Sequence, residues 1–284
     1  MKIIKEIIGF MLMAGRLFRR TDDTEILSVY FHNPNPKLFS KLINWLVRQG
    51  YDFISAGQLD EIISSGQHVT RKAIITFDDG NKEYLDLLDI INTYKVPITI
   101  FIPVEPVQSG NYWWDFAADK DQGKYTGLGS VEDFKKLKVE EFDLKMDILK
   151  NSLKLKRTCV TMDELLVLAK NPYVTIGSHT VTHPILKNCG QERQRDELRN
   201  SKNWLDEKLM QHTQYLAYPN GDYDETTLTI AAAEKYRLGF TTKPGRINLK
   251  NLNRLEIPRY AVNDEGGYFE NLAKINGLWQ AVFN

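Results

Sequence analysis

Short apolar, β-branched runs alternate along this chain with amphipathic segments, and this alternation limits the fold more than any other feature. Eight runs read as strands, at residues 26–31, 52–56, 72–80, 96–103, 173–179, 215–219, 239–242 and 255–260. Helical segments separate most of them, at 37–50, 81–95, 191–211 and 225–237. Strands that alternate with helices form βα units, so the sequence predicts an α/β fold whose parallel sheet closes, or nearly closes, into a barrel.

Composition excludes some classes of protein. The 284 residues are 42% hydrophobic and 26% charged, which is a globular composition and not a disordered one. The 37 basic and 37 acidic residues cancel, so bulk electrostatics give no reason to expect a nucleic-acid partner. Cys159 and Cys189 are too few for a disulfide framework, and we expect two buried free thiols.

One long segment interrupts the alternation. Residues 108–172 contain no convincing strand, whereas Ser130–Asp133 and Thr161–Glu164 match the capping box that begins a helix. We therefore expect a helical insertion at about residues 108–172. It opens on an aromatic cluster that includes Trp113 and Trp114.

The first 24 residues are set apart as an N-terminal amphipathic helix, and residues 25–284 as the barrel. The apolar run within residues 1–20 is too short to span a membrane, and no small-residue cleavage site follows it. Two interpretations compete: a terminal helix packed on the protein body, and a basic helix in peripheral contact with a membrane surface. A cytoplasmic protein, or one at the inner face of a membrane, is favoured over an exported one.

Two adjacent carboxylates end one of the apolar runs. Asp78 and Asp79 precede Gly80 in the sequence TFDDG. Side chains alternate along a strand, so the two carboxylates point in different directions. One can bind a metal while the other faces a substrate as a base. Taken alone, the motif is also compatible with a solvated turn.

Two of the five histidines, His179 and His183, follow another run in the sequence SHTVTHP. Their spacing allows two imidazoles to bind one metal ion, although surface histidines are the alternative. Active sites of α/β barrels lie at the carboxyl ends of the strands, so these histidines are expected to meet Asp78 and Asp79. One carboxylate and two imidazoles leave open positions on a divalent metal, and the second carboxylate supplies a base.

The pair of motifs resembles the polysaccharide deacetylase family, the NodB homology domain of carbohydrate esterases. The resemblance covers roughly residues 25–262 and implies a distorted (β/α) barrel of about seven strands. It implies that Asp79, His179 and His183 bind a divalent metal, usually Zn²⁺, and that Asp78 activates water. The sequence LAYPNGDYD (216–224) is similar to the family's third motif. That similarity places Tyr218 and Pro219 at the substrate and assigns the backbone N–H of Tyr218 to the oxyanion.

The sequence departs from well-known family members in two places. Leu216 and Ala217 stand where the third motif usually carries an arginine, and no histidine follows His212 to serve as the late general acid. The branch that acts on exopolysaccharides is more similar, because it has an early Tyr-His and a late Ile-Pro-Arg. On this basis we expect His32 to be the general acid and Arg259 to orient Asp78. A structural histidine and a surface arginine are the respective alternatives.

The implied activity is hydrolysis of acetyl groups from N-acetylated sugars of a cell-surface polysaccharide, an exopolysaccharide or a precursor of one. Trp113 and Trp114 either stack on the sugar or anchor the insertion to the barrel. Two other functions remain open. One is a metal-dependent amidohydrolase that acts on a small amide, and the other is a non-catalytic carbohydrate-binding protein.

Overall fold

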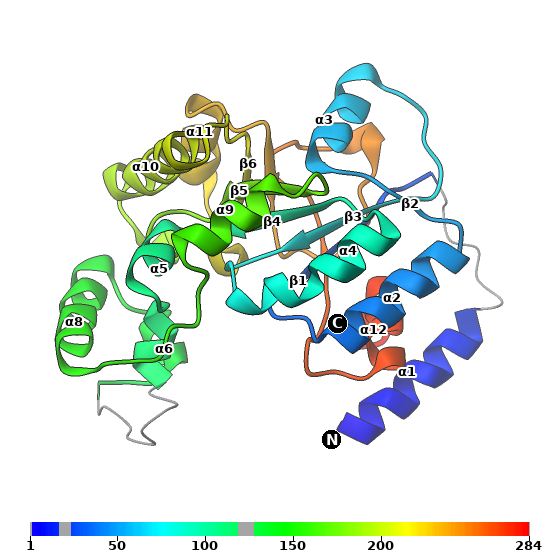
Figure 1. Ribbon diagram of the computed structural model, residues 1–284, viewed down its shortest axis with the longest axis horizontal. Coiled ribbons are helices and arrows are strands. Elements are labelled where there is room, and N and C mark those ends of the chain that lie inside the picture. The colour runs from blue at the N-terminus through cyan, green and yellow to red at the C-terminus, as the bar shows by residue number, and fades with distance from the viewer. Residues whose placement is uncertain (1, 17–23, 119–127, 284) are drawn as a thin grey trace.

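A parallel sheet forms the centre of the molecule (Figure 1). The computed structural model describes residues 2–16, 24–118 and 128–283. Neighbouring strands follow the order β7-β6-β5-β4-β3-β1-β8, with β2 beside β3. The strands are β1 (Leu27–Phe31), β2 (Asp52–Phe53), β3 (Lys72–Phe77), β4 (Ile98–Ile102), β5 (Val174–Ser178), β6 (Tyr215–Ala217), β7 (Leu238–Phe240) and β8 (Tyr260–Ala261).

The segment before β8 joins the two edges of the sheet. The N–H of Ile257 donates to the carbonyl of Gly239 in β7 (2.8 Å), and the carbonyl of Ile257 accepts from the N–H of Thr241 (2.9 Å). Three residues further on, β8 pairs with β1. The sheet is thereby curled into the predicted distorted barrel. The strand predicted at 255–260 is regular only at 260–261, because Pro258 has no N–H to donate to a ladder.

The central strands carry apolar side chains on both faces. All five residues of β1 and of β4 are buried, which is typical of parallel strands covered on both sides. Phe77 of β3 packs toward the surrounding helices, where it meets Phe39 at a ring distance of 5.5 Å. Phe101 of β4 lies in a second cluster with Phe240 of β7, at 5.2 Å. The continuous apolar runs of the sequence therefore correspond to strands with two buried faces.

Helices surround the sheet (Figure 1), as the alternation predicts. Several begin at a side chain that caps free N–H groups; Ser55, for example, caps α3 in a capping box. The helices of the barrel are α2 (Pro36–Arg48), α3 (Ala56–Ser65), α4 (Leu88–Tyr94), α5 (Val104–Ser109), α10 (Gln191–Leu209), α11 (Glu225–Ala233), α12 (Tyr268–Ile275) and α13 (Gln280–Phe283). Short 3-10 turns η1 (Lys82–Leu87), η2 (Leu186–Asn188), η3 (Pro219–Gly221) and η4 (Leu249–Asn251) lie between them.

The segment 108–172 is helical over most of its described length. It contains α6 (Trp113–Ala118), α7 (Val131–Phe134), α8 (Val139–Ser152) and α9 (Met162–Lys170), and residues 119–127 lie outside the described residues. Trp113 and Phe116 of α6 form a separate apolar cluster with Phe134, Met146 and Leu149 of the next two helices. The insertion thus has a small core of its own beside the barrel.

The N-terminal helix α1 (Lys2–Arg16) packs along α12 at the edge of the molecule (Figure 1). Gly9 allows the close approach, because a Cβ there would lie 2.4 Å from backbone atoms of Phe269 and Glu270. The helix prediction for residues 17–23 falls outside the described residues. Among the helices that the structure describes, none is long and apolar enough to cross a membrane.

We expect Gly177→Ala to destabilise the fold. A Cβ on Gly177 of β5 would lie 2.6 Å from a ring carbon of Phe101 and 3.0 Å from the carbonyl oxygen of Tyr215. Overpacking of this kind lowers the free energy of unfolding by about 1–3 kcal/mol, which urea titration measures. Gly57→Ala in α3 is the control, since its Cβ meets no atom closer than 3.5 Å. Equal stability of the two variants would contradict the proposed tight packing at β5.

Candidate metal centre

The polar residues of the site lie on turns at the carboxyl ends of the strands. Asp79 follows β3 with a φ of 80°, and Thr180 and His183 follow β5 with φ of 68° and 57°. Such left-handed backbone is uncommon for residues other than glycine and persists only where surrounding contacts hold it. One contact is the Tyr112 hydroxyl, which donates to the carbonyl of Asp79 (3.0 Å). The turns direct these side chains toward one another.

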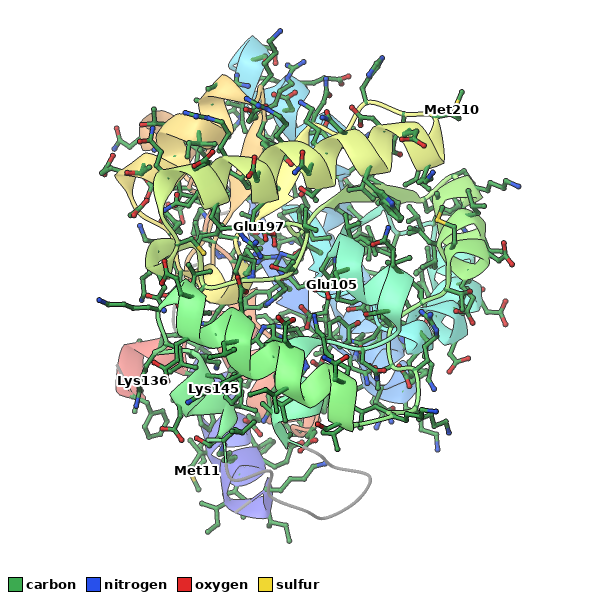
Figure 2. The ribbon with its side chains drawn as sticks, turned by 90° about the vertical axis from the view of Figure 1, so that its left-hand side faces the viewer. Met11, Glu105, Lys136, Lys145, Glu197 and Met210 are labelled. Atoms are coloured by element: carbon green, nitrogen blue, oxygen red, sulfur yellow. The ribbon has the colours of Figure 1, made fainter. Side chains whose placement is uncertain are left out.

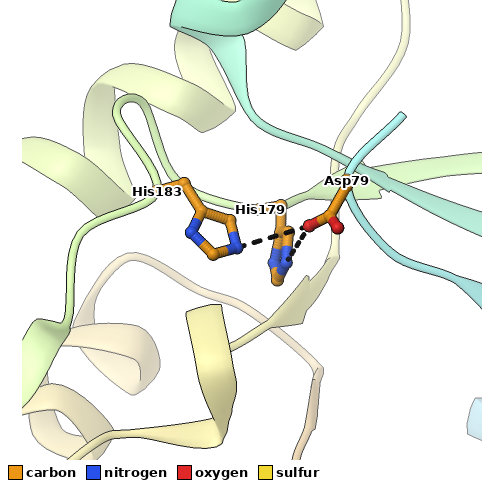
Figure 3. A group of neighbouring side chains, drawn as sticks. All are labelled: Asp79, His179 and His183. Carbon is orange, nitrogen blue, oxygen red and sulfur yellow. Dashed lines mark ion pairs between the residues drawn. The ribbon is translucent and has the colours of Figure 1, made fainter. Parts of the chain in front are cut away.

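Asp79, His179 and His183 form a compact buried triangle (Figure 3). Asp79 Oδ1 lies 3.5 Å from His179 Nε2 and 3.4 Å from His183 Nε2. One ligand atom from each residue lies within 4.8 Å of the others. All three side chains that the sequence predicts as metal ligands are therefore brought together.

The donor set of this triangle fits a divalent cation. Asp79 Oδ1 is buried and makes no hydrogen bond. His179 donates from Nδ1 to the carbonyl of Ala217 (2.8 Å), which leaves a lone pair on the Nε2 that faces Asp79. Two imidazoles and one carboxylate are the ligands of catalytic zinc sites, which keep further coordination positions open. A divalent cation would bind the buried Asp79 oxygen, which has no hydrogen-bond partner, together with the two imidazole nitrogens beside it.

Glu197 of α10 holds the turn that carries His183. Its Oε2 accepts from the backbone N–H of Val181 (2.7 Å) and of Thr182 (2.9 Å), and its Oε1 accepts from the Thr182 hydroxyl (2.7 Å). Arg193 pairs with the same carboxylate at 3.0 Å. Figure 2 shows Glu197 pointing from α10 toward the interior. The carboxylate thus satisfies the backbone of the strained turn without contacting the metal ligands.

Asp78 lies in a buried ion pair with Arg259. The guanidinium donates from Nη1 to Oδ1 (2.7 Å) and from Nη2 to Oδ2 (2.8 Å) of the carboxylate. Its Nε donates to the carbonyl of Thr241 (2.8 Å), and its carbon lies 4.3 Å from the ring centre of Tyr30. Arg259 is 0% exposed, so the alternative of a surface arginine is wrong. The two hydrogen bonds from Arg259 fix the orientation of the Asp78 carboxylate.

The charge state of the two carboxylates follows from their partners. Burial acts to raise the pKa of Asp78, but the charge of Arg259 and its hydrogen bonds to the carboxylate outweigh this effect and hold that pKa below its ordinary value. Burial acts on Asp79 in the same way, and its contacts with His179 and His183 hold its pKa far below the usual range. Both carboxylates are therefore anionic at neutral pH.

A cavity of about 180 Å³ opens over the triangle. Trp113 and Trp114 line it, with His32 and Asn220 on other sides. Trp113 is buried and donates from its indole nitrogen to the carbonyl of His183 (3.0 Å), so it anchors the insertion to the metal turn. Trp114 is half-buried, with its ring 4.7 Å from that of His183. Of the two predicted roles, anchoring fits Trp113, and contact with substrate stays a prediction for Trp114.

His32 follows β1 and lies at the rim of this cavity. Its backbone N–H donates to the Asp264 carboxylate (3.1 Å), and its carbonyl accepts from the side-chain amide of Asn81 (2.8 Å). The hydroxyl of Tyr84 lies against the carbonyls of His32 and Asp78 and shares its one proton between them. The side chain is exposed, and it also lines a groove of about 1090 Å³ outside the cavity. His32 therefore stands between the metal triangle and the groove.

The prediction for the third motif is wrong in one respect. The backbone N–H of Tyr218 was expected to bind the oxyanion. It donates instead to the carbonyl of Phe240 in β7 (3.1 Å), so it is already hydrogen-bonded within the sheet. Neither Tyr218 nor Pro219 lines the cavity. Asn220, in left-handed backbone with φ of 55°, lines it instead. The third motif therefore contributes to the cavity through Asn220 and not through Tyr218.

Other contributors were missed from the sequence. Glu197 had a detectable signal, because it shares the buried face of α10 with Gln194, Leu198 and Ser201. A carboxylate on such a face requires a polar partner. No sequence pattern points to Asp264 or Tyr84. Asp264 accepts from the backbone N–H of His32, and Tyr84 contacts the backbone carbonyl of Asp78.

Comparison with known proteins identifies the family. Residues 65–239 match the model of the polysaccharide deacetylase family, and the chain belongs to that family. It is 24% identical over 243 residues to Bacillus subtilis YxkH, whose name assigns it to the polysaccharide deacetylases; the match covers 83% of this chain and 70% of that protein.

Solved structures confirm the fold. Streptococcus pyogenes deacetylase PplD, in complex with acetate, matches with a TM-score of 0.65 and 21% identity over 88% of this chain and 98% of that one. IcaB from Ammonifex degensii matches with a TM-score of 0.64 and 17% identity, over 89% of this chain and 97% of that one. This chain thus shares its fold with both proteins, of which PplD is a deacetylase.

We expect Glu197→Ala to weaken metal binding. Without the carboxylate, the N–H groups of Val181 and Thr182 lose their acceptor and the turn that positions His183 loosens. Loss of such a supporting contact lowers metal affinity about 10- to 100-fold, which competition with a chromophoric chelator measures. Glu192→Ala, an exposed change on the same helix, should leave the affinity unchanged. Tight binding by both variants would show that the turn holds without Glu197.

We expect Arg259→Met to lower stability in a pH-dependent way. Removing one partner of a buried ion pair costs about 3–5 kcal/mol at neutral pH. The folded-state pKa of Asp78 lies below its unfolded value of about 3.9, so the pair stabilises the fold above that value. Its contribution is lost as pH falls through the depressed value, and the difference between variant and wild type shrinks there. Urea unfolding across the acidic range measures this.

The control for Arg259→Met is Arg254→Met. Arg254 is partly exposed and shares Asp60 with Arg237, so its loss leaves the carboxylate paired. We expect a loss of about 1 kcal/mol or less. Arg259→Met behaving like this control would refute the energetic importance of the buried pair.

Proposed function

We propose that this chain is a metal-dependent hydrolase that removes acetyl groups from N-acetylated sugars of a cell-surface polysaccharide, an exopolysaccharide or a precursor of one. The observation that carries the proposal is the buried Asp79–His179–His183 triangle with a second carboxylate, Asp78, held anionic beside it. Membership of the polysaccharide deacetylase family supports the substrate class. PplD, a deacetylase whose structure holds acetate, shares the fold of this chain, and this likeness supports the reaction type.

Asp79, His179 and His183 would hold the cation, for which Zn²⁺ is the expected identity from a two-histidine, one-carboxylate set. A divalent cation at such a site supplies a Lewis acid that polarises an amide carbonyl and lowers the pKa of water. The chain contributes a fixed ligand tautomer through the Ala217 carbonyl and a turn held by Glu197.

Asp78 is the proposed general base. Its carboxylate is ionised at neutral pH and is held in one orientation by two hydrogen bonds from Arg259. It takes a proton from the attacking water, while the guanidinium keeps the carboxylate from turning toward the metal ligands. Arg259 is therefore a positioning residue, because it acts through Asp78 and is 0% exposed.

His32 is the proposed general acid. Its ring lines the cavity that holds the reacting amide, and the exposed side chain can exchange protons with solvent between turnovers. It gives a proton to the departing sugar amine, and acetate leaves. The half-buried ring of Trp114, on another side of the cavity, offers an apolar face to the pyranose. The wide groove beyond His32 favours a saccharide longer than one unit over a small amide.

Two substitutions separate binding of the metal from turnover. Asp78→Asn should keep the metal and lower acetate release about 10²- to 10⁴-fold, because it removes the general base. Asp79→Ala should lose the metal itself. Metal content by mass spectrometry and acetate release from N-acetylated oligosaccharides measure the two effects. Full metal content in Asp79→Ala would refute the ligand set, and metal-loaded wild type that binds the oligosaccharides without releasing acetate would support a carbohydrate-binding protein instead.

A further inference from the structure

One face of α1 is fixed against the barrel by specific contacts. Glu6 accepts from the backbone N–H groups of Phe269 (3.0 Å) and Glu270 (3.0 Å) at the start of α12. A carboxylate at this position also meets the positive end of the α12 dipole. Gly9 gives the close backbone approach on the same side. These contacts set the rotation of α1 about its axis, and so decide which residues face outward.

The opposite face of α1 is apolar and open to solvent. The exposed fractions are 76% for Ile3, 62% for Ile4, 49% for Ile7, 54% for Phe10 and 65% for Met11. Figure 2 shows Met11 projecting from α1 at the edge of the molecule. We call these five residues the α1 outer face. A helix that is apolar on the side away from its own protein needs another apolar environment to cover that side.

The charges near this face are basic. Lys2 is exposed at its start, and the side chain of Lys5 is 38% exposed. The single acid of α1, Glu6, is turned inward onto α12. An apolar helix face with basic residues near it is complementary to anionic lipid headgroups above an acyl layer. A second copy of the chain fits less well, because a two-fold contact would bring like charges together.

We propose that the α1 outer face docks on a lipid bilayer that contains anionic lipids, with α1 lying in the plane of the interface. The five apolar side chains enter the boundary between headgroups and acyl chains, and the basic residues contact the headgroups. The groove that begins at His32 is also lined by Lys2, at the start of α1. Docking therefore brings the outer end of this groove next to the membrane surface.

Co-sedimentation of the full chain with vesicles tests this proposal. Vesicles of phosphatidylcholine and phosphatidylglycerol in equal parts should retain the protein, and vesicles of phosphatidylcholine alone should retain much less. The double variant Ile7→Asp/Met11→Asp should lose binding by about 100-fold or more, since two large apolar side chains no longer enter the lipid. Phe10 is left unchanged because its ring also packs on Phe269 of α12, with ring centres 5.1 Å apart. Lys2→Gln should lower binding to the anionic vesicles about fivefold, and less at high salt.

The matched control is Leu144→Asp/Ile148→Asp on α8. Those residues are 63% and 47% exposed, and α8 lies on the opposite side of the barrel from α1 (Figure 1). The control should bind vesicles like wild type, and thermal unfolding should confirm that all variants are folded. Failure of wild type to bind anionic vesicles would overturn the proposal. Equal vesicle binding by the α1 and α8 variants would also overturn it. So would a wild-type protein that does not bind vesicles but is a dimer in light scattering, if the α1 variant is a monomer.

Discussion

The buried ion pair of Asp78 and Arg259 links the closing of the barrel to the chemistry of the site. Arg259 lies between β7 and β1, in the segment that joins the two edges of the sheet, and has no exposed surface. A guanidinium buried this deeply needs hydrogen-bond acceptors and a counter-charge around it. Thr241, Thr76 and Asp78 accept four hydrogen bonds from it, and Asp78 supplies the negative charge. The interaction that completes the sheet therefore also holds the proposed base in place.

The parallel topology explains why the other site residues meet. All strands run in one direction, so the turns after β1, β3 and β5 emerge at one end of the barrel with His32, Asp79 and His179. The strain of the left-handed turns is borne by contacts from outside them, Tyr112 for Asp79 and Glu197 for the turn after β5. Each of these two turns is therefore hydrogen-bonded to a neighbouring element and not only within itself.

Sequence reasoning could predict the parts of this structure that repeat a local pattern. The apolar runs correspond to strands, and the carboxylate and histidine motifs meet at their ends. It could not decide which N–H of the third motif faces the site, because the bond from Tyr218 to Phe240 depends on how β6 and β7 pair. It also could not find Asp264, whose contact with His32 spans 232 residues and follows no periodicity. Pro258 is evident in the sequence, but the sequence alone does not show that the regular strand beside it is limited to residues 260–261, because that depends on pairing with β1.

The position of Arg259 has a consequence for the order in which the protein matures. All three proposed metal ligands have been synthesised by residue 183, whereas Arg259, whose guanidinium orients Asp78, comes 76 residues later. A chain still being translated carries its complete ligand set well before the closing segment exists. Under the proposed function, the ligand set and the oriented base would thus be completed at different times, and a molecule cut short before its last strand would lack the arginine that orients Asp78.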